Sequence, residues 1–84
     1  MATEVRLPQW GMGMVDGEII AWLKEVGDHV DLGEGLVEVE TSKVVEILES
    51  PVSGTLVRQV AEVGDVVPVR DVVAIIDEGA ESGE

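Results

Sequence analysis

The chain has 84 residues, of which 18 are Asp or Glu and 5 are Lys or Arg, so its formal net charge is −13. This length fits one small domain, and the acidic excess disfavours binding to nucleic-acid phosphates or to an anionic membrane. Cysteine is absent, which excludes disulfides and zinc–thiolate sites as supports of the fold. No apolar run approaches the roughly 20 residues of a membrane span. Residues 1–6 lack a secretory pattern, so we expect an intracellular protein.

Side chains with catalytic chemistry are scarce. The sequence has one histidine, His29, and two lysines, Lys24 and Lys43, and it has no tyrosine. We expect His29 at a turn on the surface, because it follows a Gly-Asp pair, and Lys24 at a solvated strand position. This scarcity is the feature that a functional assignment has to explain.

Short β-strands are predicted along the whole chain, because Val, Ile and Leu dominate and no stretch has the apolar spacing of an amphipathic helix. The expected strands are, in chain order, 5–7, 17–22, 28–30, 36–40, 44–48, 54–59, 66–67 and 72–76. The three prolines, Pro8, Pro51 and Pro68, fall at or beside the ends of these strands, where a missing N–H breaks no ladder bond. Eight short strands predict two antiparallel sheets packed as a flattened barrel or sandwich.

An internal repeat relates the two halves of the sequence. A shift of 37 positions aligns residues 17–30 with residues 54–67 without a gap. The identical pairs are Gly17/Gly54, Glu25/Glu62, Val26/Val63, Gly27/Gly64, Asp28/Asp65 and Val30/Val67. Two copies are too few for a solenoid, so we expect two half-domains that face each other across a pseudo-twofold axis.

One motif lies between the two halves. The polar residues 41–43 connect two β-prone segments, 36–40 and 44–48, which predicts a hairpin with Lys43 at or beside its tip. Four glutamates surround this lysine in the sequence: Glu38, Glu40, Glu46 and Glu49. This acidic field favours the protonated form of Lys43 and disfavours a role as a free amine nucleophile. On its own, the motif favours a solubilising hairpin lysine over a functional one.

Five short segments extend the pattern: residues 7–14 (LPQWGMGM), 17–19 (GEI), 26–30 (VGDHV), 37–43 (VEVETSK) and 50–54 (SPVSG). In their order and spacing the chain resembles the lipoyl domains of 2-oxo acid dehydrogenase complexes and of the related acetoin-cleaving complex. The resemblance implies an all-β barrel-sandwich hybrid of two four-stranded antiparallel sheets with pseudo-twofold symmetry. It also implies lipoic acid joined by an amide bond to Lys43. The lipoyl domain would span residues 5–77, between an N-terminal extension (1–4) and a flexible acidic linker (78–84).

The resemblance further implies a carrier without a catalytic site of its own, since the dithiolane of the cofactor performs the chemistry. In that family a thiamine-diphosphate-dependent decarboxylase component reductively acylates the arm, an acyltransferase core passes the acyl group to coenzyme A, and dihydrolipoamide dehydrogenase reoxidises the dithiol. A lipoate ligase or lipoyl transferase attaches the cofactor. We therefore expect a parent dihydrolipoamide acyltransferase in the bacterial cytoplasm or the mitochondrial matrix. The isolated domain is expected to be monomeric.

The resemblance also implies that the loop of residues 11–16 lies beside the hairpin of Lys43, so residues of both segments are expected to contribute to recognition by these partners. The candidates are Gly11, Met12, Gly13, Met14, Asp16, Glu40, Thr41, Ser42 and Val44. A plain connecting loop is the alternative for residues 11–16. The family usually has Asp-Lys-Ala where this chain has Ser42-Lys43-Val44, and both this tip and the WGMGM segment favour an acetoin or branched-chain subclass.

Two other functions remain open. Biotin carriers share the fold and modify a tip lysine, but that lysine normally lies between two methionines, which are absent here. A cofactor-free acidic domain that binds basic partners is the second alternative. The facing of the strand after Lys43 is also open, because either Val45 with Ile47 or Val44 with Leu48 forms its buried set.

Overall fold

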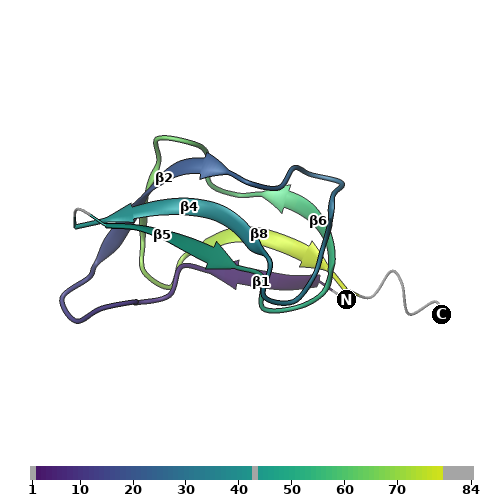
Figure 1. Cartoon of the computed structure of the whole chain (residues 1–84), viewed down its shortest axis with the longest axis horizontal. Coiled ribbons are helices and arrows are strands. Elements are labelled where there is room, and N and C mark those ends of the chain that lie inside the picture. Colours follow the sequence, from purple (N-terminus) through teal and green to yellow (C-terminus); the bar gives the residue numbers. More distant parts are fainter. Residues whose placement is uncertain (1, 43, 79–84) are drawn as a thin grey trace.

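The structure is a computed structural model that describes residues 2–42 and 44–78. It consists of eight β-strands and contains no helix over these residues (Figure 1). The strands are β1 (Ala2–Arg6), β2 (Asp16–Trp22), β3 (His29–Val30), β4 (Gly35–Thr41), β5 (Val44–Glu49), β6 (Gly54–Gln59), β7 (Val66–Pro68) and β8 (Val72–Asp77). The expected all-β fold is confirmed, and each predicted strand is present.

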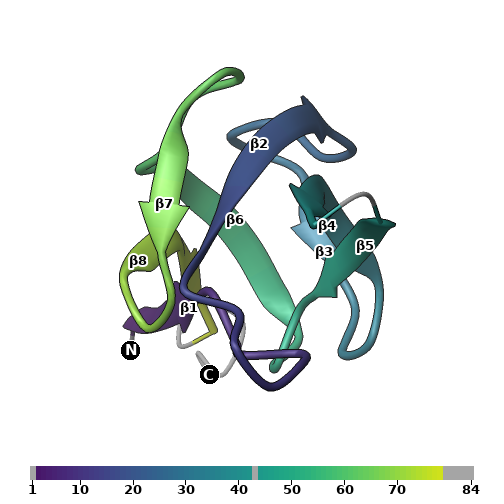
Figure 2. The same ribbon diagram turned by 90° about the vertical axis from the view of Figure 1, so that its left-hand side faces the viewer.

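The strands form two four-stranded antiparallel sheets that enclose the core (Figure 2). One sheet has the order β1-β8-β6-β3 and the other has the order β5-β4-β2-β7. The repeat superimposes β2 on β6, β3 on β7 and β4 on β8, so the two strand orders are equivalent position by position. Even the irregularities match: the β2–β4 register shifts after Ile19, and the β6–β8 register shifts after its repeat partner, Leu56. The predicted pseudo-twofold symmetry is therefore confirmed.

The two Gly-Asp turns of the repeat join the halves. Gly27 (φ 100°) and Gly64 (φ 95°) adopt the left-handed conformation that favours glycine. The N–H of Gly27 donates to the Leu56 carbonyl at 2.7 Å, and the N–H of Gly64 donates to the Ile19 carbonyl at 2.8 Å. Each turn thus binds a strand of the other half, which explains why the two copies require each other.

A single hydrophobic core lies between the sheets and draws on both halves. Its fully buried side chains include Val5, Leu7, Ile19, Val30, Leu36, Val37, Val39, Leu56, Val73 and Ile76. Side chains alternate between the two faces of each strand, so the inward set of each sheet meets the inward set of the other.

The ends of the domain differ from the expectation. β1 begins at Ala2, three residues before the strand expected from Val5, because Ala2 pairs with Asp77 at the far end of the chain. Three residues of the expected N-terminal extension are therefore strand. Glu78, expected in the linker, accepts a hydrogen bond from the Thr3 hydroxyl at 2.5 Å. The rest of the expected linker, 79–84, lies outside the described residues.

Lys24 also differs from the expectation, since it follows the end of β2 and is not a freely solvated strand residue. Its Nζ lies 2.7 Å from Oε2 of Glu34, and the Lys24 side chain is 25% exposed. This hydrogen-bonded ion pair raises the pKa of Lys24 and lowers the pKa of Glu34. The pair joins the turn after β2 to the turn before β4.

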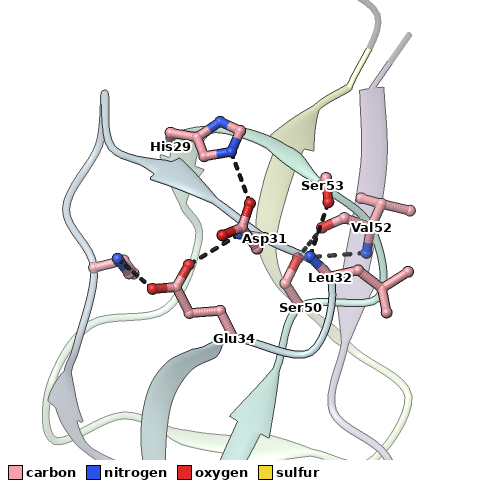
Figure 3. A network of polar contacts seen from close by, with 8 residues as sticks. His29, Asp31, Leu32, Glu34, Ser50, Val52 and Ser53 are labelled. Atoms are coloured by element: carbon pink, nitrogen blue, oxygen red, sulfur yellow. Dashed lines mark hydrogen bonds and ion pairs between the residues drawn. The ribbon is translucent and has the colours of Figure 1, made fainter.

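His29 is exposed, as expected, although it lies in β3. Its Nε2 is 3.0 Å from Oδ1 of Asp31, and the N–H of Asp31 donates to Oε1 of Glu34 (Figure 3). In the same region the Ser53 hydroxyl accepts a hydrogen bond from the N–H of Leu32 at 2.9 Å. These contacts connect the turns near the Glu49 end of β5. The candidate site lies at the Val44 end of the same strand.

Candidate functional site

The β4–β5 hairpin is the centre of the candidate site. Thr41 pairs with Val44, so residues 42 and 43 form its two-residue connection, and the predicted hairpin is confirmed. Ser42 has a φ of 40°, the left-handed conformation that tight two-residue hairpins require. Lys43, the predicted attachment residue, lies outside the described residues.

A loop between β1 and β2 lies beside this hairpin, at the end of the molecule away from the start of β1 (Figure 1). A turn closes the loop, with the N–H of Met14 donating to the Gly11 carbonyl at 3.2 Å. Gln9 donates from Nε2 to the Met14 carbonyl at 3.2 Å, while the Met12 side chain makes no such contact and is fully exposed. The loop therefore presents Met12 to solvent on an otherwise anchored turn.

Two hollows separate the loop from the hairpin. The first, of about 400 Å³, is lined by Gly13, Met14, Val15, Asp16, Glu18, Glu40, Thr41, Ser42 and Val66. The second, of about 260 Å³, is lined by Trp10, Gly11, Met12, Gly13, Met14, Thr41, Ser42, Val44 and Glu46. Together they bring into one site all nine residues that the sequence nominated for partner recognition. Five further lining residues were not nominated: Trp10, Val15, Glu18, Glu46 and Val66.

The first hollow is strongly acidic. Glu18 of β2 and Glu40 of β4 are direct cross-strand partners, and Asp16 lines the same space. Like charges directly opposite each other on a sheet destabilise it. None of these three carboxylates forms an ion pair with a described cation. These three carboxylates therefore make the described wall of this hollow anionic.

The structure settles which face of β5 is inward. Leu48 is 5% exposed, whereas Val45 and Ile47 are 53% and 41% exposed. The inward set is therefore the one that contains Leu48, and Val44 of that set is exposed because it lies at the tip. By the same alternation Glu46 shares the inward side of β5, where it is half-buried. From the sequence alone, Val45 and Ile47 were as suitable for burial as Val44 and Leu48, so the pattern could not determine the inward face of β5.

Chemistry by the described side chains themselves is sparse. Over the described residues, no three His, Cys, Asp or Glu side chains form a group suited to a metal ion. The same part of the chain has no helix that is long and apolar enough to cross a membrane. The site consists of the β4–β5 hairpin, the exposed side chain of Met12 and a surface rich in carboxylates.

Residues 3–76 match the family model for biotin and lipoyl attachment, described as "Biotin-requiring enzyme". The chain belongs to this family. The match covers both sheets and the hairpin, so fold and site fall within the family region.

The chain is similar to parts of several acyltransferase components of dehydrogenase complexes and of the acetoin cleaving system. The chain is 42% identical to the dihydrolipoyllysine-residue acetyltransferase component of the acetoin cleaving system of Pseudomonas putida, with 93% of this chain and 21% of that protein covered. It is 45% identical to the corresponding component of the pyruvate dehydrogenase complex of Corynebacterium glutamicum, over 89% of this chain and 11% of that protein. The chain thus spans about a fifth or less of the length of these relatives.

Solved structures confirm the family fold. The lipoyl domain of the 2-oxoglutarate dehydrogenase complex of Azotobacter vinelandii has a TM-score of 0.72 and 27% identity, over 89% of this chain and 95% of that domain. Kluyveromyces lactis urea carboxylase has a TM-score of 0.80 and 26% identity, over 92% of this chain and 6% of that protein. The barrel-sandwich architecture expected from the sequence is therefore confirmed.

Proposed function

We propose that this chain is a lipoyl carrier domain in which lipoic acid is joined by an amide bond to Lys43. The observation that carries the proposal is the hairpin whose last pair, Thr41 with Val44, flanks a connection containing Lys43 in a chain 42% identical to an acetoin-system acetyltransferase component. Ser42 and Val44 are both exposed, so the surroundings of the connection are accessible to a modifying enzyme.

Lipoic acid, when attached, would supply the dithiolane that carries acyl groups and electrons. The chain's own contribution is position. The β4–β5 ladder fixes the base of the connection through the Thr41–Val44 and Glu40–Val45 pairs. The termini of the domain lie together, since Ala2 pairs with Asp77, so tethers to the parent protein would leave from β1 and β8 and raise the local concentration of the arm at each partner site.

The partners in this proposal are a thiamine-diphosphate-dependent decarboxylase component, an acyltransferase core, dihydrolipoamide dehydrogenase and a lipoate ligase or lipoyl transferase. The parent chain would be a dihydrolipoamide acyltransferase that acts in the cytoplasm. The loop residues Gly11, Met12, Gly13, Met14 and Asp16, together with Glu40, Thr41, Ser42 and Val44, would be read by these partners. The two hollows between loop and hairpin support this role, because they unite these residues on one surface.

A biotinyl carrier is the second candidate, favoured by the description of the family model. Ser42 and Val44 disfavour it, because they stand where biotin carriers have methionines on both sides of the lysine.

Intact-mass measurement after co-expression separates the candidates. With a lipoate ligase and lipoate, we expect one lipoyl increment on the domain and none on Lys43→Gln. Lys24→Gln is the matched control, since it removes the only other lysine, and it should be modified as fully as the parent. A biotinyl increment with a biotin ligase and biotin would replace the proposal with its alternative. No increment under either condition would leave the cofactor-free acidic domain.

A further inference from the structure

β5 is an edge strand. It is terminal in the order β5-β4-β2-β7, so one side of its backbone is paired with β4 and the other side faces away from the sheet. Beyond the ladder with β4, no backbone hydrogen bond joins residues 44–49 to another described segment. An unpaired strand edge of this length is a template for the backbone of another extended chain.

A groove runs along this free edge. The hollow of about 260 Å³ beside the hairpin is followed by one of about 370 Å³ lined by Pro8, Trp10, Glu46, Ile47, Leu48 and Glu49. The two hollows share Trp10 and Glu46, so they follow β5 from Val44 to Glu49 with the 8–14 loop as the opposite wall. The groove therefore has the length of the strand and not of a small pocket.

The charges of the groove are unbalanced. Glu46 and Glu49 form no hydrogen bond or ion pair with another described side chain. The symmetry-related edge strand, β1, differs, because there Glu4 is paired with Arg6. Glu46 is half-buried and faces the same two hollows as Trp10, whose side chain is 36% exposed. A carboxylate and an aromatic ring on opposite walls suit a cationic side chain, which gains from both.

We propose that the free edge of β5 binds an extended segment of a partner protein by strand addition, with a lysine or arginine of that segment between Trp10 and Glu46. The backbone of the segment satisfies the unpaired N–H and C=O groups of β5. Apolar side chains at alternate positions of the segment cover Val45 and Ile47, which are about half exposed on the other face of the strand.

Charge argues for a heterologous occupant and against a second copy of this chain. Two copies paired through β5 would bring Glu46 and Glu49 of both molecules into one interface, and each molecule has a net charge of −13. A cationic segment removes that repulsion. The proposal is independent of lipoylation, because none of its contacts involves the cofactor.

The test uses the unmodified domain and a capped seven-residue peptide of alternating valine and arginine. In an NMR titration we expect saturable shifts concentrated in the amides of residues 44–49 and 8–14. The same peptide with every internal backbone nitrogen methylated keeps its charge but loses its donors, and we expect it to bind at least about tenfold more weakly. Trp10→Ala and Glu46→Gln should each weaken binding by about threefold or more.

Glu62→Gln is the matched control, because Glu62 is an exposed carboxylate in the other half of the molecule. It should leave the affinity unchanged. Equal binding of the methylated peptide, or equal weakening by Glu62→Gln and Glu46→Gln, would show general charge attraction and overturn the proposal. Concentration-dependent shifts along β5 in the absence of peptide would identify a second copy as the occupant and overturn it as well. Intact mass of the lipoylated domain is measured separately, so failure here leaves the carrier function untouched.

Discussion

Trp22 and Gln59 occupy equivalent positions in the two halves and make equivalent hydrogen bonds despite their different chemistry. Trp22 donates from Nε1 to the Ala61 carbonyl at 3.1 Å, and Gln59 donates from Nε2 to the Lys24 carbonyl at 2.9 Å. Ala61 and Lys24 are themselves equivalent in the repeat. The pseudo-twofold symmetry therefore extends to a pair of side-chain hydrogen bonds. Sequence identity does not reveal this pair, because the two donors are different residues.

Removing either of these hydrogen bonds should destabilise the fold by a similar amount. Gln59→Leu leaves the Lys24 carbonyl without its donor, and Trp22→Phe leaves the Ala61 carbonyl without its donor, so each should lower the free energy of unfolding by about 1 kcal/mol. Urea denaturation followed by circular dichroism measures both. Arg58→Gln, an exposed change on the same strand as Gln59, is the control. If these two hydrogen bonds contribute nothing to stability, both variants will have the same urea midpoint as Arg58→Gln.

Local pattern was sufficient to predict all eight strands, because their β-branched runs are bounded by Gly, Pro and Asp. It missed the start of β1, since Thr3 and Glu4 carry no apolar alternation and become strand only by pairing with β8 at the far end of the chain. The facing of β5 was undecided because both of its faces are apolar, and burial of Leu48 depends on the opposite sheet.

Only part of the candidate site could be predicted from the sequence, because the rest depends on tertiary contacts. The family resemblance indicated nine residues that the structure brings together, but five other lining residues were missed, Trp10 and Glu46 among them. Both line the site through tertiary contact between the loop and the edge of β5. The signal for Glu46 was its spacing of two from Leu48, which has meaning only once the inward face is known.

The close approach of β6 to β8 makes Gly54 sensitive to any side chain. A Cβ at Gly54 would lie 2.7 Å from the Asp77 carbonyl oxygen and 2.9 Å from Cγ2 of Ile76. Gly54→Ala should therefore lower the free energy of unfolding by about 1–3 kcal/mol. Gly11→Ala is the matched control, because apart from its chain neighbours no described residue has a heavy atom within 4 Å of its Cβ position. A Gly54→Ala domain as stable as Gly11→Ala would show that β8 shifts freely away from β6.

The Lys24–Glu34 pair predicts a pH dependence on both sides of neutrality. The pKa of Glu34 is lowered from 4.5 by its hydrogen bond with Lys24, so this contribution is present above pH 4.5 and is lost as pH falls through the lowered value. The pKa of Lys24 is raised from 10.5 by the same bond, so its contribution is present below pH 10.5 and is lost as pH rises through the raised value.

Glu34→Gln tests this dependence, because its amide oxygen can still accept the hydrogen bond from the N–H of Asp31. The difference in unfolding free energy between parent and variant should be constant between about pH 5 and pH 10 and should shrink outside that range. Added salt should reduce it throughout, since both side chains reach solvent. A difference that keeps its size at pH 3 would assign the effect of Glu34 to packing and not to charge.

Met12 offers the most direct test of partner recognition. Its side chain is fully exposed, on a turn held by Gly11 and Met14, so truncation removes contact area without disturbing the fold. If the decarboxylase component contacts this loop, Met12→Ala should lower kcat/KM for reductive acylation by about threefold to tenfold, which is about 0.7–1.4 kcal/mol and corresponds to a methionine side chain that is partly buried in the complex. Lipoylation measured by intact mass should be unchanged, because the β4–β5 hairpin is intact.

Leu32→Ala is the control, since Leu32 is also exposed but lies in the turn before β4, beside Ser53. An equal loss in both variants would mean that the decarboxylase responds to general surface hydrophobicity, and no loss in Met12→Ala would return residues 11–16 to the role of a connecting loop.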